Sequence, residues 1–117
     1  MMIRYNRRSL CAGDDVYNGI YDIEMPDDAV LKDLIEILIY GGNGNDWPLA
    51  HNHDGWLICS DIGGIAHISG DLKEVQYCDA DRDTGLSVLG ISWVFGEYEG
   101  ADPDDTRRRC RYLFEQD

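Results

Sequence analysis

The chain has 117 residues, of which 44% are hydrophobic, and it carries a formal net charge of −13. This length fits a single domain over residues 1–117, with enough apolar residues to form a core without a metal or a disulfide. The acidic balance argues against direct binding to nucleic acid or to an anionic membrane surface, and no apolar run reaches the roughly 18 residues of a membrane span.

The first strands are predicted from residues that alternate in polarity. Ile3 and Tyr5 alternate with polar neighbours, and residues 18–25 alternate again after a turn. A period of two is typical of a β-strand, so these two segments predict an opening β-hairpin. Because the N-terminus lacks the apolar region of a signal peptide, we also expect a cytoplasmic protein.

A helix is predicted over residues 28–40. Asp27 and Asp28 are placed to cap its first turn, and apolar residues recur three and four positions apart along it. The pair of glycines at 41–42 ends it. Residues 41–55 then follow neither period, and a structureless loop of this length is uncommon in a compact domain and often functional.

The second half of the chain is predicted to be mostly strands. The expected strands are 56–60, 65–69 and 74–78, followed by a short helical turn at 86–90 and a strand at 91–95. Ile91, Trp93 and Phe95 are expected on one face of that last strand. Asp102-Pro103 opens a final helix at about 103–115, because Pro is favoured just after a capping Asp. The residues expected in the core are Tyr21, Ile23, Val30, Leu34, Leu38, Ile58, Ile68 and Trp93.

The order of hairpin, helix and further strands resembles the β-grasp fold of ubiquitin-like proteins. Residues 24–34 look like that family's second strand, acidic cap and helix start, and residues 86–91 look like its turn into the closing strand. The resemblance implies an α+β domain: a β-grasp-like mixed sheet of about five strands with one packed helix, here with an additional C-terminal helix. Conjugation chemistry is not implied, because the chain ends in Glu-Gln-Asp rather than Gly-Gly.

The charges are unevenly distributed along the chain. Residues 9–106 hold 21 acidic residues against Lys32, Lys73 and Arg82, a formal charge of −18, whereas both ends are rich in arginine. We expect these arginines to fold back onto the acidic body and relieve part of its self-repulsion.

Cysteine and histidine give no strong chemical motif. The four cysteines form no CxxC pair, so Cys59 and Cys78, in strand-like runs, are expected to be buried, reduced thiols rather than a disulfide. His51, His53 and Asp54 are the best metal candidates, because a His-x-His pair can direct both rings at one ion. A solvated loop explains them more simply, so no metal and no cofactor are expected.

Asp79, Asp81 and Asp83 resemble half of a calcium loop. An EF-hand needs glycine at position six and glutamate at position twelve, where this chain has Thr84 and Gly90. These three aspartates are therefore interpreted as a solvated turn or part of an acidic contact patch.

These features favour one of two functions. The leading hypothesis is an acidic protein-binding module, not an enzyme, that inhibits a basic, nucleic-acid-binding protein by mimicking phosphates. Its composition resembles that of nuclease immunity, anti-restriction and anti-CRISPR proteins. The alternative is a small metal-dependent or ligand-processing enzyme built on the loop 46–54. The predicted partner-binding residues are Asp14, Asp15, Trp47, Asp79, Asp81, Asp83 and Tyr98.

Overall fold

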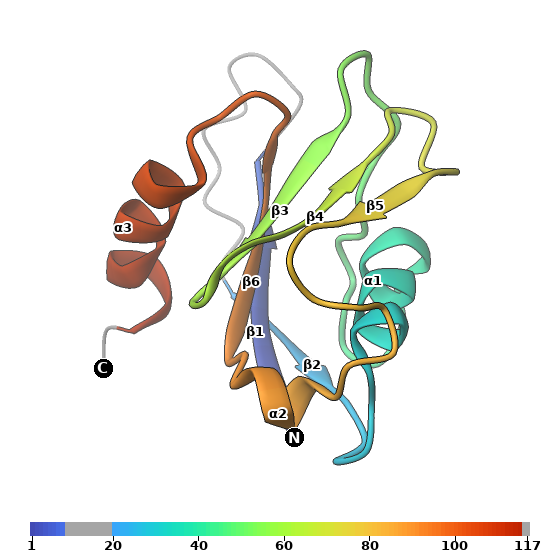
Figure 1. Ribbon diagram of the computed structural model, residues 1–117, viewed down its shortest axis with the longest axis vertical. Helices are drawn as coiled ribbons and strands as arrows, with labels where there is room; N and C mark the ends of the chain where they lie inside the picture. The colour runs from blue at the N-terminus through green and yellow to red at the C-terminus, as the bar shows by residue number, and fades with distance from the viewer. Residues whose placement is uncertain (9–19, 116–117) are drawn as a thin grey trace.

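A computed structural model describes residues 1–8 and 20–115 (Figure 1). Cys11, Asp14 and Asp15 lie outside this part of the chain. The elements are β1 (Met2–Arg7), β2 (Tyr21–Glu24), α1 (Leu31–Tyr40), β3 (Trp56–Ser60), β4 (Gly63–Ile68), β5 (Val75–Tyr77), α2 (Leu86–Leu89), β6 (Trp93–Tyr98) and α3 (Pro103–Phe114). Of these helices, none is long and apolar enough to cross a bilayer.

The strands form one mixed sheet in the order β2-β1-β6-β3-β4-β5. β1 runs parallel to β6, and the other neighbours are antiparallel. The predicted α+β, β-grasp-like arrangement is confirmed, with an opening hairpin, a helix against the sheet and a closing strand beside β1. All six predicted strand segments join one sheet, which therefore has six strands rather than about five, with the three-residue β5 at the outer edge beside β4.

Helix α1 covers one face of the sheet, but it begins later than predicted. Leu31, Leu34 and Leu38 are buried on its inner side. Val30 is extended and forms a β-bridge with Gly85, which keeps the residues before Leu31 out of the helix. The predicted capping by Asp27 or Asp28 is therefore wrong: the Val30 N–H donates instead to the Asp33 carboxylate at 3.0 Å.

Most of the predicted core is confirmed. Ile23, Leu34, Leu38, Ile58, Ile68 and Trp93 are buried. Tyr21 and Val30 are only half-buried, since Tyr21 lies on the edge strand β2 and Val30 precedes the helix.

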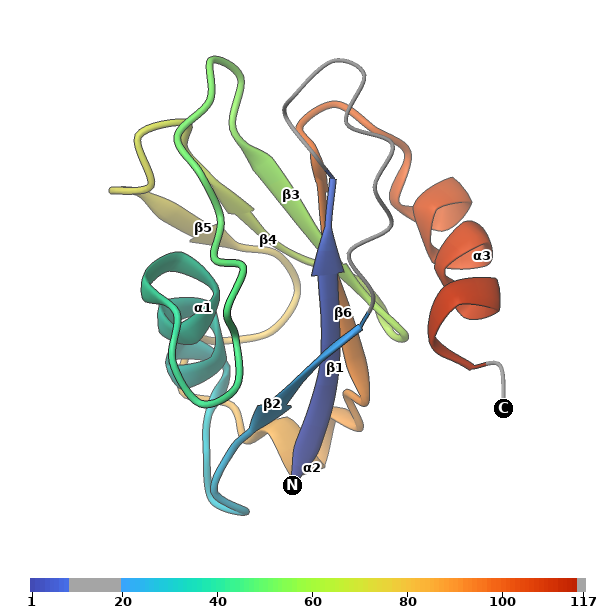
Figure 2. The same cartoon turned by 180° about the vertical axis from the view of Figure 1, so that it is seen from behind.

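Two hydrophobic clusters occupy opposite faces of β6. Trp93 and Phe95 pack under α3, whereas Val94 belongs to the main core with α1. Because successive strand residues point to opposite faces, α1 and α3 lie on opposite sides of the sheet, as Figures 1 and 2 show. The predicted common face of Ile91, Trp93 and Phe95 is wrong, because Ile91 precedes the strand and packs in the main core.

Helix α3 begins as predicted and packs against β6. Asp102 caps it by accepting a hydrogen bond from the Asp104 N–H at 3.0 Å, and Pro103 follows. The Trp93 and Phe114 rings stack with centroids 4.9 Å apart. Along the helix, Asp105 forms ion pairs with Arg109 at 3.4 Å and with Arg108 at 3.3 Å.

Removing this cap gives a first testable result. Asp102→Ala is expected to lower the free energy of unfolding by about 1 kcal/mol, because the first turn of α3 loses a side-chain acceptor. Urea unfolding measures the loss. Asp104→Ala is the matched control, since it removes a neighbouring charge and keeps the cap, and equal losses in the two variants would contradict this role of Asp102.

The cysteines are only partly as expected. Cys59, Cys78 and Cys110 are all free thiols. Cys59 is buried, and this burial raises the pKa of its thiol to about 12. Cys78 is exposed, contrary to prediction, because it follows β5 on the same side as the exposed Gln76 and away from the core that Tyr77 contacts.

Candidate partner-binding surface

One buried carboxylate gathers arginines from both ends of the chain. Glu97 on β6 is 1% exposed, and it pairs with Arg8 at 2.8 Å and with Arg109 at 3.0 Å. The Thr106 hydroxyl donates to the same carboxylate at 3.0 Å. Burial alone would raise the pKa of Glu97, but the hydrogen bonds from Arg8, the Tyr98 N–H and Thr106 outweigh it and lower that pKa below its ordinary value.

Other terminal arginines also contact the body of the domain. The Arg7 guanidinium lies 4.0 Å from the Trp47 ring centroid and donates to the Pro48 carbonyl at 2.9 Å. Arg4 donates to the Phe114 carbonyl at the end of α3. These contacts confirm that arginines near both ends fold back onto the acidic body.

The carboxylates, in contrast, remain largely at the surface. Among the Asp and Glu residues within 1–8 and 20–115, only Glu97 is buried, and Asp61 and Glu99 are half-buried. Because Arg8 and Arg109 pair with the buried Glu97 and Arg7 donates to a backbone carbonyl, most exposed carboxylates in these ranges have no arginine beside them, and the net charge of the outer surface is strongly negative.

Several of these acids surround an open hollow on the α3 side of the sheet. Helix α3 reaches this face near the start of β4, where Pro103 lies against Gly64, and leaves the face over the end of β4 and β5 uncovered. The hollow has a volume of about 390 Å³, and we call it the acidic hollow. It is lined by Asp54, His67, Ile68, Ser69, Glu74, Val75, Gln76 and Glu99.

Strand alternation directs His67 and Gln76 into the acidic hollow. Ala66 and Ile68 pack in the main core, so His67 between them points to the opposite face, and Gln76 is its partner on β5. Glu99 lies just beyond β6, and its carboxylate oxygens are 2.8 and 2.9 Å from His67 Nδ1. In the neutral ring this geometry corresponds to an Nδ1–H that donates to Glu99.

A close backbone approach places Asp54 at the same hollow. The Asn52 N–H donates to the Gly70 carbonyl at 3.0 Å, which ties the 41–55 segment to the end of β4. Gly55 has a φ of +97°, and a Cβ there would lie 2.7 Å from the Ile68 carbonyl oxygen. Glycine is therefore required beside Asp54 for this segment to lie against β4.

The metal candidates do not converge. His51 and His53 are exposed, and only Asp54 of the three lines the acidic hollow. Over the residues that the structure describes, no group of three or more His, Cys, Asp or Glu side chains is arranged to hold a metal ion. The segment is also not structureless, because the Leu49 N–H donates to Leu38 and the Trp56 indole to the Ala50 carbonyl.

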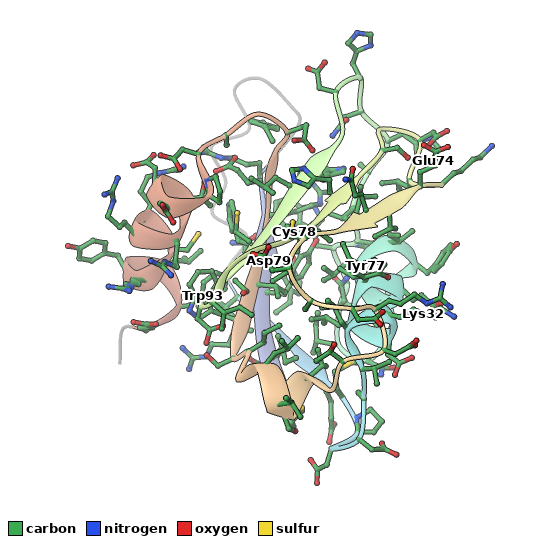
Figure 3. All side chains as sticks on the ribbon, viewed as in Figure 1. Lys32, Glu74, Tyr77, Cys78, Asp79 and Trp93 are labelled. Carbon is green, nitrogen blue, oxygen red and sulfur yellow. The ribbon has the colours of Figure 1, made fainter. Side chains whose placement is uncertain are left out.

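The three candidate aspartates after β5 are exposed but differ in their surroundings. Asp79 follows Cys78 beyond the end of β5 (Figure 3). Partial burial raises the pKa of the Cys78 thiol, and the negative charges of Asp79 and Glu99 raise that pKa further. Asp81 and Asp83 lie in the stretch that docks on the start of α1, where the Lys32 N–H donates to the Arg82 carbonyl at 2.8 Å.

Trp47 and Tyr98 belong to a different part of the surface. The Tyr98 ring is 42% exposed and stacks on Trp56 with centroids 6.3 Å apart. Arg7 lies between Trp47 and Trp56, 4.0 and 5.6 Å from their ring centroids. The two predicted aromatic anchors therefore share an arginine–aromatic cluster, whereas the aspartates lie near α1 and the end of β5.

Three residues of the acidic hollow, Glu74, Glu99 and His67, are not among the site residues predicted from the sequence. Glu74 immediately precedes β5 and Glu99 immediately follows β6, two strands that are not neighbours in the sheet. The alternation around His67 was a signal for its outward direction, but nothing in the sequence placed these two acids beside it.

Comparison with known proteins gives no relative from which to transfer a function. No family model, curated protein or solved structure matches this chain.

Proposed function

We propose that this protein is an acidic protein-binding module that neutralises a basic, nucleic-acid-binding partner, in the manner of immunity, anti-restriction or anti-CRISPR proteins. The acidic hollow is the observation that carries the proposal. Asp54, Glu74 and Glu99 line it, and it opens on a sheet face that α3 leaves uncovered. Carboxylates in such a hollow are suited to an arginine or lysine side chain, which forms charge-assisted hydrogen bonds with them.

The overall charge supports the same proposal. A net charge of −13 repels nucleic acid, so the chain competes for the partner rather than for the nucleic acid itself. Carboxylate oxygens on its surface take the place of phosphate oxygens in the partner's basic groove. Asp79 extends the acidic surface from Glu99 past the end of β5, and Asp81 and Asp83 add exposed negative charge beside the start of α1. Charge complementarity of this kind raises the association rate and sets specificity.

One observation favours the alternative of a small metal-dependent or ligand-processing enzyme. His67 is held by Glu99 in the acidic hollow beside Asp54 of the 46–54 loop, and a carboxylate that orients an imidazole is a common arrangement for a general base. This enzyme would use His67 in place of His51 and His53. Turnover separates the functions, because a binding module leaves its captured partner covalently unchanged, whereas an enzyme converts a substrate and loses this turnover in His67→Ala.

The proposal is tested by capture with a matched pair of triple variants. The wild-type chain is immobilised and exposed to nuclease-treated lysate of the source cells, and retained proteins are identified by mass spectrometry. We expect a basic protein, bound at least about tenfold more weakly by Asp54→Asn/Glu74→Gln/Glu99→Gln.

The control variant removes the same charge elsewhere. Asp22→Asn/Glu24→Gln/Asp28→Asn changes three exposed acids near β2 and is expected to bind within about threefold of wild type, because only long-range attraction is weakened. Equal losses in the two variants would contradict a role for the acidic hollow. Retention of only acidic or neutral proteins would contradict the proposed function.

A further inference from the structure

The outer edge of β5 has backbone groups that no described strand uses. The Ser69 N–H donates to the Glu74 carbonyl at 2.9 Å, and the Cys78 N–H donates to the Ile65 carbonyl at 3.0 Å. Gln76, midway between them, is paired with His67. Residues 74, 76 and 78 therefore bond inward to β4, and the N–H and C=O groups of Val75 and Tyr77 point outward.

The opposite edge of the sheet is already covered. The Glu24 N–H on β2 donates to the Asn43 carbonyl at 2.8 Å, and the Asn43 side chain donates back to the Glu24 carbonyl at 3.0 Å. Gly44 lies so close that a Cβ would be 2.2 Å from the Asp22 carbonyl oxygen. Of the two outer strands, β5 is thus the one whose edge can accept another strand.

The acidic hollow adjoins this open edge. Val75 and Gln76 both line it, together with Glu74 at the start of β5. Tyr77 points toward α1, on the other side of the sheet (Figure 3), and it packs with Val75 against the main core. A strand added beside β5 continues this alternation, so every second side chain lies on the side of the hollow.

The charged and apolar residues around the β5 edge determine which side chains of an added strand are favoured on each side of the sheet. Asp54, Glu74 and Glu99 favour cations on the side of the hollow. Lys73 precedes β5, and its N–H donates to the Asp71 carboxylate at 3.1 Å, so an acid shares its turn. On the other side, Val75 and Tyr77 present apolar surface at the margin of the core, which favours apolar residues at the intervening positions.

We propose that the partner docks an extended segment as a seventh strand along the outer edge of β5, with arginine or lysine at alternate positions entering the acidic hollow and apolar residues between them. This inference rests on the proposed function and specifies the partner's contact segment. Backbone hydrogen bonds to Val75 and Tyr77 provide affinity, and the carboxylates select a basic–apolar–basic pattern.

Two peptides of identical composition test this pattern. One alternates, acetyl-Thr-Arg-Val-Arg-Val-Arg-Thr-amide, and the other groups the same residues as Arg-Arg-Arg-Val-Val-Thr-Thr. Titration into isotope-labelled protein, followed by amide NMR shifts, is expected to give at least about tenfold tighter binding of the alternating peptide. The largest shifts are expected at Val75, Gln76, Tyr77 and His67. Equal binding of both peptides, or binding of neither, would overturn strand addition.

Two changes to the backbone donors complete the test. Val75→Pro removes an outward N–H while the bonds to β4 remain, and an edge strand tolerates proline at such a position. N-methylation of the central Val-Arg-Val of the alternating peptide disturbs the same bonds without altering the protein. Both are expected to reduce binding at least about tenfold, and undiminished binding of the N-methylated peptide would overturn the inference.

These outcomes are separable from failure of the proposed function. If the peptides do not distinguish the patterns but the captured partner still depends on Asp54, Glu74 and Glu99, the acidic hollow binds its partner without an added strand. If the captured partner also binds the Asp54/Glu74/Glu99 triple variant as tightly as wild type, both proposals fail.

Discussion

Glu97→Ala is expected to lower the free energy of unfolding by about 3 kcal/mol. The change removes the shared partner of Arg8, Arg109 and Thr106 from a site where the carboxylate is 1% exposed. Breaking a buried pair typically costs about 3 to 5 kcal/mol, and the lower figure applies because both arginines are partly exposed and regain water. Urea unfolding at neutral pH measures the loss.

A second variant separates charge from shape. Glu97→Gln keeps the size of the side chain and one acceptor oxygen, so a smaller loss is expected than for Glu97→Ala. A loss below about 1 kcal/mol in Glu97→Ala would show that this network does not join α3 to the sheet.

The same carboxylate sets an acid dependence. The pKa of Glu97 is lower in the folded chain than its ordinary value of 4.5, so its contribution to stability is complete above pH 4.5 and is lost as the pH falls through the folded value. The stability difference between wild type and Glu97→Gln is therefore expected to shrink as acid is added. A difference that stays constant from neutral pH to about pH 3 would contradict this linkage.

Trp56→Ala is expected to have the largest effect on stability, about 4 kcal/mol. Trp56 is fully buried, and its indole N–H donates to the Ala50 carbonyl at 2.8 Å. The variant leaves a large cavity in the main core beside Gly96, and it removes the indole donor that holds the 41–55 segment. Thermal and urea unfolding measure the loss.

Trp56→Phe is the matched control for this cavity. It keeps an aromatic ring that stacks with Tyr98 but cannot donate to Ala50, so a loss of about 1 to 2 kcal/mol is expected. Equal stability of Trp56→Ala and Trp56→Phe would contradict the cavity as the main cause of the loss.

The sequence predicts the elements better than it predicts where they begin. Polarity alternation finds the strands, and the apolar stripe finds α1, because both patterns follow from burying one face. The start of α1 is misplaced because Val30 pairs with Gly85, a contact between distant parts of the chain. Ile91 is assigned to the wrong face because strand alternation does not hold before β6 begins.

The candidate site was harder to predict than the fold. Asp54 was found, but as a neighbour of His51 and His53 rather than of Glu74 and Glu99. Its true neighbours follow from the antiparallel pairing of β4 with β5 and from the close approach of Gly55 to Ile68, neither of which leaves a local signal. The exposed edge of β5 likewise depends on strand order, which residue patterns do not fix.

The central claim, that an acidic surface displaces nucleic acid from a basic partner, is tested most directly by competition. The captured partner is bound to a fluorescent nucleic acid duplex, and wild-type protein is added at increasing ionic strength. We predict stoichiometric displacement at low salt, with an association rate that falls steeply as salt screens exposed charges beyond about 10 Å at 0.1 M, while dissociation changes little. Duplex that stays bound at every salt concentration, or displacement that is independent of salt, would contradict the account.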